Sequence, residues 1–549
     1  MRDFAALYQG LDSSTRTGDK VAALESYFRE AEPADAAWAI HFLAGRRPRL
    51  GVKRGDLRAW AAQAADVPDW LFDECHTAVG DMAETLNLVV PPGDGAEERG
   101  LAWWVEERLM ALAGAAPADQ RAIMLEAWAR LPFAERFVWN KLVTGAFRVG
   151  VSRGLLVRGV AGALGAPVSR VDERLMGDWK PVPGLLGQLC VADSGADPTA
   201  PRPFFLASPL VDPLAELGDR DGWQAEWKWD GIRCQAVCRQ GRAHLWSRGE
   251  ELVTDRFPEV AGVLARLPDG TVLDGEIVAR RDGAILPFHD LQRRIGRTAV
   301  TRAILRDVPV AMIAYDLLCH AGEDSRAMPL ADRRAMLERV VLPLSGSHLI
   351  LSTVLRGDWP ALEALRSRAA EHMAEGIMLK RLSSPYRAGR VRGDWWKWKV
   401  DPRVIDAVLV MSRRGSGRRA GLFTDHTFAV WKGNELVPVA SAYSGLDDKE
   451  MRELDGIIRS SGLEQFGPVR TVRPEHVFEL AFEGIGRSPR HRSGVALRFP
   501  RISRWRRDKP PAEADRLETL EAMIVAAPAI ARKETTGELF PDWPGAGGR

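Results

Sequence analysis

A lysine between two tryptophans has the surroundings that covalent chemistry requires. It lies in the segment EWKWDG at 226–231, in which Lys228 is followed by Asp230 and Gly231. A lysine amine is a nucleophile only where it is rigidly held and at least partly deprotonated. A strand ending at Trp227 would fix the backbone, and we expect desolvation by the indoles and nearby arginines to disfavour the charged ammonium. We also expect Gly231 to let the turn approach a ligand closely. Lys228 is therefore the candidate nucleophile.

Segments that carry acids, aromatic rings and cations follow Lys228 in a fixed order. Taken alone, each of these side chains has an ordinary interpretation as a strand-edge acid, a core aromatic residue or a solvated lysine. Their order between residues 226 and 509 is therefore considered as a set. The segments are SRGEELVT (247–254), LDGEIVA (273–279), AYDLL (314–318), EGIMLK (375–380), WWKWK (395–399) and RFPRISRWRRDK (498–509).

This ordered set resembles the motifs of the covalent nucleotidyltransferases and, within them, of the ATP-dependent DNA ligases. The resemblance covers nearly the whole chain, because NKLVTGAFRVGVS at 140–152 resembles the DNA-binding domain of the larger members. It implies an enzyme that seals 3′-hydroxyl/5′-phosphate nicks in duplex DNA through a lysyl-AMP and a 5′-adenylated DNA, with ATP and Mg²⁺ (or Mn²⁺) as cofactors. HFLAGRRPRL at 41–50 resembles bacterial members encoded beside a helicase and nucleases. By analogy this suggests a role in DNA repair, with such proteins as partners.

The resemblance gives the motif residues their expected roles. Lys228 takes AMP from ATP, Glu276 meets the ribose or a metal, and Glu375 is the second metal-directed carboxylate. Attack on the α-phosphorus places negative charge on its oxygens, which lysines and Mg²⁺ would stabilise. Two carboxylates on separate strands would leave room for phosphate oxygens around Mg²⁺. The expected nucleotide-binding residues are Glu226 and Tyr315 for adenine, Arg233 and Arg248 for ribose and phosphates or for the nicked 5′-phosphate, Lys397 and Lys399 for the α-phosphate, and Arg506 and Lys509 for the pyrophosphate.

The elements that must position these residues fall into three regions. Residues 1–190 place apolar side chains three and four apart, which predicts helices. From about residue 204, strand-like runs such as WQAEWKW, IRCQAVC, TVLDGEIVA and VPVAMIAYDLL alternate with helices, one of them from an Asp358 cap to Gly376. After Asp401-Pro402, short strands with Gly and Arg turns continue to about residue 507, a length typical of a five-stranded barrel.

Together with the resemblance, these patterns predict a multidomain α+β fold. We expect an all-α DNA-binding domain at 1–200, an ATP-grasp-like α+β adenylation domain at 204–401, an OB-fold β-barrel domain at 402–530 and a flexible tail at 531–549. The segment VADSGADPTAPRP at 191–203 has the composition of a linker.

Contacts with DNA are expected to involve the phosphate backbone, because a ligase must act at any sequence. Glycines between arginines let backbone amides approach phosphates, and a glycine turn before a helix capped by Ser152 would present free N–H groups. The expected contacts are Arg46, Arg47, Arg49, Lys141, Arg148, the amides around Gly150, and Arg413, Arg414, Arg418 and Arg419.

The composition limits the class of protein. At 549 residues, of which 46% are hydrophobic, we expect several globular domains. Since no apolar run approaches the ~18 residues that span a bilayer and no secretory signal is evident, we expect a cytoplasmic, nucleoid-associated monomer without membrane contacts. Five cysteines make no disulfide framework; Cys234 and Cys238 are expected on one face of a strand.

Two other functions stay open at this stage. An RNA ligase or mRNA-capping guanylyltransferase shares the Lys-x-Asp-Gly chemistry, but it would lack the helical region and the GAFRVGVS turn. A non-catalytic protein that binds DNA ends would not need Lys228, paired acids and an adenine-stacking ring together.

Overall fold

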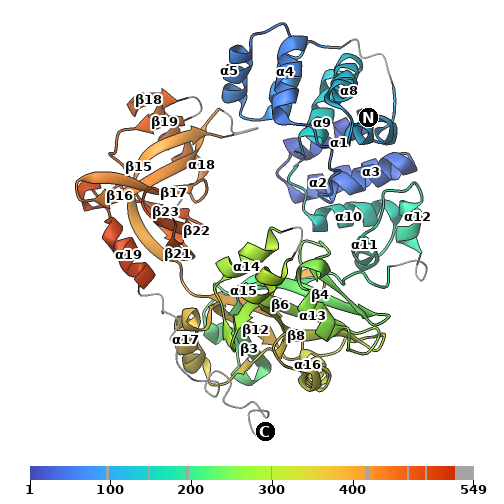
Figure 1. The fold of residues 1–549 in the computed structure, drawn as a ribbon, viewed down its shortest axis with the longest axis vertical. Helices are drawn as coiled ribbons and strands as arrows, with labels where there is room; N and C mark the ends of the chain where they lie inside the picture. Colours follow the sequence, from blue (N-terminus) through green and yellow to red (C-terminus); the bar gives the residue numbers. More distant parts are fainter. Residues whose placement is uncertain are drawn as a thin grey trace. The chain divides into compact units, whose positions relative to one another are not determined.

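The computed structural model describes residues 1–93, 98–145, 147, 149–191, 197–297, 300–415, 421–466, 469–488 and 491–525. The chain forms two compact units, whose elements are labelled in Figure 1. The first unit comprises Met1–Ala166, Lys180–Gly187 and Pro402–Ala526, and the second comprises Pro167–Trp179 and Gln188–Asp401. The expected tail at 531–549 lies outside the described residues.

The N-terminal part of the chain is helical, as its apolar periodicity predicts. Trp104, Trp128 and Trp139 are fully buried among these helices. The segment 101–112 departs from a regular helix, because a π-helical turn at Trp104–Leu109 and a 3₁₀ turn at Met110–Leu112 follow α7. The helices are α1 (Arg2–Ser13), α2 (Thr17–Glu30), α3 (Pro33–Leu43), α4 (Arg54–Ala64), α5 (Asp69–Val79), α6 (Met82–Val89), α7 (Leu101–Trp103), α8 (Pro117–Arg130), α9 (Phe133–Thr144), α10 (Arg153–Leu164), α11 (Val168–Arg174) and α12 (Leu185–Cys190).

The C-terminal part of the first unit is mostly β-structure. In the described residues β15 is the long central strand: it pairs with β16, β19 and β20, and β17, β18 and β23 extend the sheet to seven strands. In its core Phe478 stacks on Trp505 and meets Phe428 edge to face. The elements are β15 (Arg403–Arg414), β16 (Phe423–Lys432), β17 (Glu435–Ala442), α18 (Asp448–Ser461), β18 (Gly462–Phe466), β19 (Val469–Val472), β20 (Val477–Phe482), β21 (Gly484–Arg487), β22 (Val495–Arg498), β23 (Arg501–Trp505) and α19 (Leu517–Val525).

The second unit contains two sheets with helices packed on them. One sheet has the order β10-β8-β6-β4-β5, and the other has the order β11-β3-β12-β14-β2. The elements are β1 (Phe205–Leu206), β2 (Ser208–Pro209), β3 (Trp223–Trp229), β4 (Ile232–Arg239), β5 (Arg242–Ser247), α13 (Pro258–Leu264), β6 (Val272–Arg281), β7 (Ala284–Ile285), α14 (Phe288–Ile295), α15 (Arg302–Asp307), β8 (Val310–His320), β9 (Glu323–Asp324), α16 (Leu330–Val341), β10 (Leu349–Leu351), β11 (Val354–Leu355), α17 (Trp359–Ser367), β12 (Ala374–Arg381), β13 (Gly389–Arg390) and β14 (Trp395–Lys399).

Most sequence expectations for the second unit are confirmed. The four strand-like runs correspond to β3, β4, β6 and β8, and Cys234 and Cys238 are both buried on β4. Asp358 caps α17 by accepting the N–H of Ala361. The end of that helix is corrected: α17 stops at Ser367, and Gly376 lies inside β12.

The expected linker is partly packed on the second unit. Of residues 191–203, those at 192–196 lie outside the described residues. The carbonyl of Thr199 accepts a hydrogen bond from the indole of Trp246, and the N–H of Arg202 donates to the side chain of Gln235. In the described part of the chain, no helix is both long and apolar enough to cross a membrane.

Candidate active site

The candidate nucleophile shares one face of a sheet with other polar residues of the motifs. Glu226 on β3 lies opposite Met378 on β12, which lies opposite Lys397 on β14. Alternate residues of a strand point to the same face. This face, called here the site face, therefore carries Gln224, Glu226, Lys228, Met378, Lys380, Trp395, Lys397 and Lys399.

The flanking tryptophans of the nucleophile point the other way. Trp227 and Trp229 belong to the apolar cluster on the opposite face of the sheet, together with Ile377 and Trp398. They fix the strand by packing, so the expectation that both indoles cover the amine is corrected by the alternation of the strand.

A β-bulge places the carboxylate of Glu375 beside Lys228. The pairing of β12 with β3 shifts between Ala374 and Ile377, so that Glu375 and Gly376 together face Lys228. Gly376 has a φ of +143°, and a Cβ at that position would lie 2.3 Å from the carbonyl oxygen of Trp398. The bulge therefore requires glycine at position 376.

The charged partners of Lys228 differ from the expected ones. Its Nζ lies 2.5 Å from Oε2 of Glu375, and Nζ of Lys399 lies 3.3 Å from the same oxygen. Burial acts to raise the pKa of Glu375, but the two ammonium groups outweigh it and hold the pKa below its ordinary value. The amine is thus paired with a carboxylate and lies near a second ammonium, while Arg233 acts with Lys228 on Glu276.

Glu276 is a second carboxylate near the amine. Burial raises the pKa of Glu276 to about 8, although Lys228 and Arg233 oppose this shift. A Cβ at Gly231 would lie 2.4 Å from the carbonyl oxygen of Ile277 and 2.9 Å from Cγ of Glu276. Gly231 is therefore needed where the turn after β3 approaches β6, and its close approach to a ligand stays a prediction.

Glu276 and Glu375 fit a divalent cation. They are oxygen donors from separate strands, and Mg²⁺ is commonly held by one or two carboxylates together with substrate phosphates. A cation beside Glu276 would favour its ionised form. In the described residues, no group of three or more His, Cys, Asp or Glu side chains could hold a metal ion. The donor set thus suits an ion whose other ligands come from a nucleotide or water.

The side chain of Arg233 binds groups of its own unit rather than being available to a ligand. Its Nε and Nη2 bind the two oxygens of Asp274 at 3.2 and 2.7 Å, and its Nη1 donates to the carbonyl of Phe205 at 2.6 Å. The hydroxyls of Tyr315 and Tyr386 also donate to Asp274, at 3.2 and 2.6 Å. The three guanidinium nitrogens expected to contact ribose and phosphates therefore already have protein partners. The same network anchors the ring of Tyr315 expected to stack on adenine.

Glu226 is also more deeply buried than expected. It is 1% exposed and forms an ion pair of 2.6 Å with Lys380. An adenine edge could therefore contact Glu226 only at the end of the site face where Glu226 and Lys380 are buried, called here the buried end. Its expected role stays a prediction.

A cluster of cations surrounds Lys397. Burial lowers the pKa of Lys397, and the positive charges of Arg390, Lys399, Lys228 and Arg248 lower it further. Arg248 is exposed after β5, and its N–H donates to the carbonyl of Arg233. Convergence of these cations from β3, β13, β14 and the turn after β5 creates a site suited to an anion.

The two C-terminal cations expected at the pyrophosphate share one partner. Nη1 of Arg506 and Nζ of Lys509 bind the same oxygen of Asp406, at 2.8 and 2.7 Å. Arg506 also pairs with Asp508 at 2.9 Å. Hydrogen bonding to Arg506 lowers the pKa of Asp508 to about 2. Asp406 on β15 therefore holds the two cations together within the first unit.

Some of the N-terminal residues expected to contact DNA are exposed, and others are buried. Arg47 and Arg49 are exposed and Arg46 is half-buried; Arg47 also donates to the carbonyl of Gly145. The expectation for Lys141 is corrected, because this residue is only 8% exposed and its amine forms an ion pair with Asp81 at 2.9 Å. It is therefore withdrawn from the expected DNA contacts. Arg148 lies outside the described residues.

The turn before α10 has a different construction from the expected one. Gly150 is exposed with a φ of +60°, and its carbonyl and that of Val149 accept hydrogen bonds from Lys20. Ser152 is the N-cap residue of α10, but its side chain forms no capping hydrogen bond. The amides expected to bind phosphate remain a prediction.

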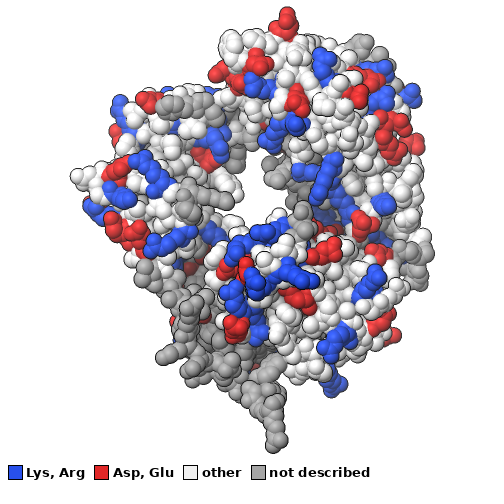
Figure 2. Space-filling model, viewed as in Figure 1, with Lys and Arg blue, Asp and Glu red and all other residues white. Residues whose placement is uncertain are grey.

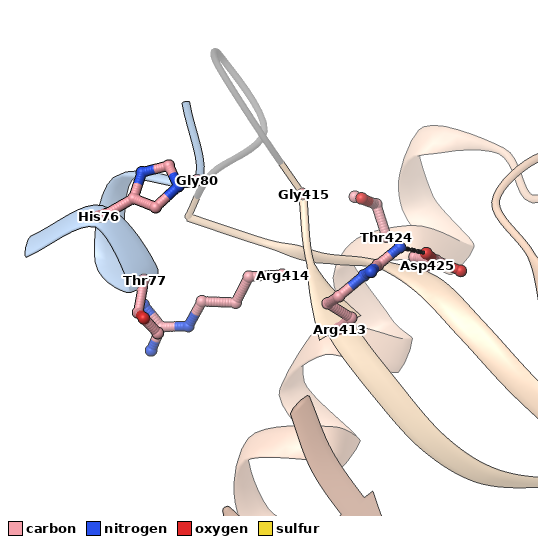
Figure 3. Close-up of a pocket in the computed structure, with 8 residues that line it drawn as sticks. All are labelled: His76, Thr77, Gly80, Arg413, Arg414, Gly415, Thr424 and Asp425. Carbon is pink, nitrogen blue, oxygen red and sulfur yellow. Dashed lines mark hydrogen bonds and ion pairs between the residues drawn. The ribbon is translucent and has the colours of Figure 1, made fainter. Parts of the chain in front are cut away.

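Two of the C-terminal arginines line a pocket. Arg413 pairs with Asp425 of β16, whereas the side chain of Arg414 extends in the opposite direction, as Figure 3 shows. Arg418 and Arg419 lie outside the described residues. Figure 2 shows Lys and Arg side chains interspersed with Asp and Glu over the visible face, in keeping with the formal net charge of +2.

Sequence reasoning missed Asp274, Lys380 and Arg390. Asp274 and Glu276 are two residues apart in LDGEIVA, a spacing that places both on one face of a strand and could have identified the partner of Arg233. Lys380 ends EGIMLK, but only the pairing of β12 with β3 brings it to Glu226. The sequence carries no signal that places Arg390 beside Lys397.

Comparisons with known proteins cover most of the chain. Family models match as the DNA ligase N terminus over residues 1–161, the ATP dependent DNA ligase domain over 205–399 and the ATP dependent DNA ligase C terminal region over 419–509. A probable DNA ligase of Koribacter versatilis is 32% identical over 95% of this chain and 96% of its own length. One of Streptomyces griseus is 33% identical over 91% and 95%. The solved structure named Pmar-Lig_PreS3 shares the fold with a TM-score of 0.57 at 16% identity, covering 92% of this chain and 99% of its own.

Proposed function

The chain belongs to the family of ATP-dependent DNA ligases, and we propose that it seals 3′-hydroxyl/5′-phosphate nicks in duplex DNA through AMP carried on Lys228. The observation that carries the assignment of Lys228 is its ion pair of 2.5 Å with Glu375, beside a cluster of cations and a second carboxylate. This arrangement offers a nucleophile, a carboxylate that orients it and an anion site within one unit.

The first step transfers AMP to the protein. Nζ of Lys228 attacks the α-phosphorus of ATP, a nitrogen–phosphorus bond forms, and the bond to the bridging oxygen breaks so that pyrophosphate leaves. The ammonium of Lys228 gives up its proton to water before the attack, and Glu375 orients the amine through its 2.5 Å contact. Lys397 and Lys399 stabilise the charge that develops on the α-phosphate oxygens. A divalent cation, which members of the family use, would be held by Glu276 and Glu375 and would supply further stabilisation of phosphate charge.

Two further transfers complete the reaction. An oxygen of the 5′-phosphate attacks the phosphorus of the bound AMP, and the bond to Lys228 breaks. The 3′-hydroxyl then attacks the 5′-phosphate and releases AMP. Arg248 on the exposed turn after β5 is proposed to bind the 5′-phosphate, and Arg506 and Lys509 to orient the pyrophosphate in the first step.

The domain assignments are part of the proposal. We assign residues 1–200 to a DNA-binding domain, 204–401 to an ATP-grasp-like adenylation domain, 402–530 to an OB-fold domain and 531–549 to a tail. Support for the OB-fold assignment comes from the antiparallel pairing of the long strand β15 with β16, β19 and β20. Support for DNA binding comes from the exposed Arg47, Arg49 and Arg413. We also propose a monomer. A role in DNA repair with helicase or nuclease partners is proposed from the resemblance of the segment 41–50.

A covalent-adduct assay tests the assignment of Lys228. The full chain is mixed with α-labelled ATP and Mg²⁺, denatured, and examined for retained label, and joining of a nicked duplex is measured in parallel. We expect Lys228→Ala and Lys228→Arg to lose both activities, because alanine offers no nitrogen and a guanidinium stays protonated. Lys432→Ala serves as the matched control, since Lys432 is an exposed lysine of β16. Label retained on Lys228→Ala would move the nucleophile elsewhere.

Substrate choice is tested with the wild-type protein. Nicked DNA and nicked RNA of the same sequence are compared at equal concentration. Faster joining of nicked RNA would favour an RNA ligase, and absence of any adduct together with tight binding to DNA ends would favour a non-catalytic binding protein.

A further inference from the structure

The buried end of the site face holds a carboxylate surrounded by donors. Oε2 of Glu226 accepts from Nζ of Lys380 at 2.6 Å, and Oε1 accepts from Gln224 at 2.8 Å and from Arg334 at 3.4 Å. Glu226 and Lys380 are each 1% exposed. Since a carboxylate offers about four lone-pair sites, Glu226 can accept one more donor.

Lys380 links this carboxylate to the aromatic rings beside it. Its Nζ lies 4.2 Å from the ring centroid of Tyr315 and 4.6 Å from that of Trp395. A cation over an aromatic face is attracted to it, more strongly when both are desolvated. The ammonium is therefore held between Glu226 and two rings, one of them the ring expected to stack on the base.

The hydrogen bonds that a carboxylate can form decide which base it can bind. An ionised carboxylate only accepts hydrogen bonds, whereas a protonated one can also donate. Adenine carries an amino donor at N6, and guanine carries a carbonyl acceptor at the equivalent O6. The ammonium of Lys380 donates to Oε2 of the carboxylate at 2.6 Å and so fixes its position. Glu226 held there would accept from adenine and repel guanine.

We propose that Lys380 is a positioning residue that sets the preference for ATP over GTP by holding Glu226 as an acceptor at the base. This inference rests on the proposed function, because it requires a nucleotide that reacts at Lys228 with its base beside Tyr315. Lys380 does not touch the nucleotide. It acts through Glu226.

The test measures base preference rather than activity alone. The full chain is mixed with Mg²⁺ and either ATP, GTP or inosine triphosphate, which has a carbonyl at the same position as guanine, and the rate of adduct formation is followed by intact-protein mass. For the wild type we expect ATP to react at least about tenfold faster than either carbonyl nucleotide, the size expected for one hydrogen bond to a charged group.

Four variants separate selectivity from folding. Lys380→Met removes the charge at similar length and is expected to lower the ATP-to-GTP rate ratio about tenfold or more. Lys380→Arg keeps a buried cation and should retain the ratio. Glu226→Gln, whose amide can also donate, should lower the ratio. The double variant Glu226→Gln with Lys380→Met removes both charges of the buried pair and is compared with Glu226→Gln if Lys380→Met fails to fold. If Lys380 acts through Glu226, the two variants should give the same ratio, and a further fall in the double variant would overturn the inference.

Each result has a defined meaning. Equal loss of the ATP and GTP rates in Lys380→Met, with an unchanged ratio, would show that Lys380 only stabilises the fold. A wild type that reacts equally with ATP and inosine triphosphate would overturn the inference without any variant and leave the proposed function intact. A wild type that forms no adduct with ATP would overturn the proposed function itself.

Discussion

Replacing Gly376 with alanine should break the bulge that holds Glu375 against Lys228. The backbone there has a φ of +143°, and the new Cβ would lie 2.3 Å from the carbonyl oxygen of Trp398 and 2.7 Å from Cα of Lys399. A side chain in such a backbone region costs about 1–3 kcal/mol, and overpacking against a neighbouring strand costs about 1–3 kcal/mol more. We expect Gly376→Ala to lower the free energy of unfolding by about 2–6 kcal/mol.

Thermal unfolding followed by tryptophan fluorescence measures this destabilisation, because β3 and β14 are rich in tryptophan. A decrease of about 4 kcal/mol corresponds to a fall in Tm of roughly 8–16 °C for a unit of this size. Adduct formation at 25 °C should fall with it, since Glu375 moves from its 2.5 Å contact with Lys228. Gly262→Ala is the matched control: Gly262 lies in α13 with open space around its Cβ, and the change should stabilise the helix by about 0.5–1 kcal/mol. A Tm of Gly376→Ala within about 2 °C of wild type, by the scaling of roughly 2–4 °C per kcal/mol, would refute the reasoning.

Three other predictions use different assays. Alanine at both Arg506 and Lys509 should impair adduct formation with ATP but spare joining of a pre-adenylated nick. The control Arg507→Ala should leave both reactions unchanged. Equal impairment of both reactions would assign Arg506 and Lys509 to DNA binding. Because burial raises the pKa of Glu276 to about 8, metal-dependent adduct formation should rise with pH up to that value. In the folded protein, this carboxyl holds a proton more tightly than a glutamate with the ordinary pKa of 4.5. The stability that the protonated carboxyl contributes should therefore be lost as pH rises from about 4.5 to 8. Glu276→Gln should remove the pH dependence of adduct formation and of stability. Alanine at the arginines of the segment 45–49 should flatten the log–log salt dependence of DNA affinity by roughly one unit for each phosphate that the protein no longer neutralises, and an unchanged slope would exclude them from the interface.

Sequence periodicity predicted the strands of the second unit because their two faces differ in polarity. In β3, the odd-numbered tryptophans pack in the core while Glu226 and Lys228 lie on the site face. Alternation of this kind is local, so it can be read from a single segment. The motif order then identified the residues that β3, β6, β12 and β14 bring to one site.

Partners across strands could not be read in the same way. Nothing local in the sequence specifies that Glu226 is held by Lys380, or that Lys141 is buried against Asp81. Such pairs depend on strand register and helix packing, which are set by long-range contacts. A prediction from charge alone therefore assigned too many basic residues to contacts with ligands.

The position of Glu375 shows how an irregular strand creates a site that a regular one could not. Ile377 and Leu379 are fully buried on the core face of β12, and a regular strand would place Glu375, two residues before Ile377, on that same face. A carboxylate there would lack a partner and carry a desolvation penalty. The extra residue of the bulge instead turns Glu375 to the site face, where it meets Lys228 and Lys399. Ala374, on the far side of the bulge, is back in the apolar cluster. The glycine that permits this inserted residue is thus as necessary to the geometry of the nucleophile as the carboxylate it repositions.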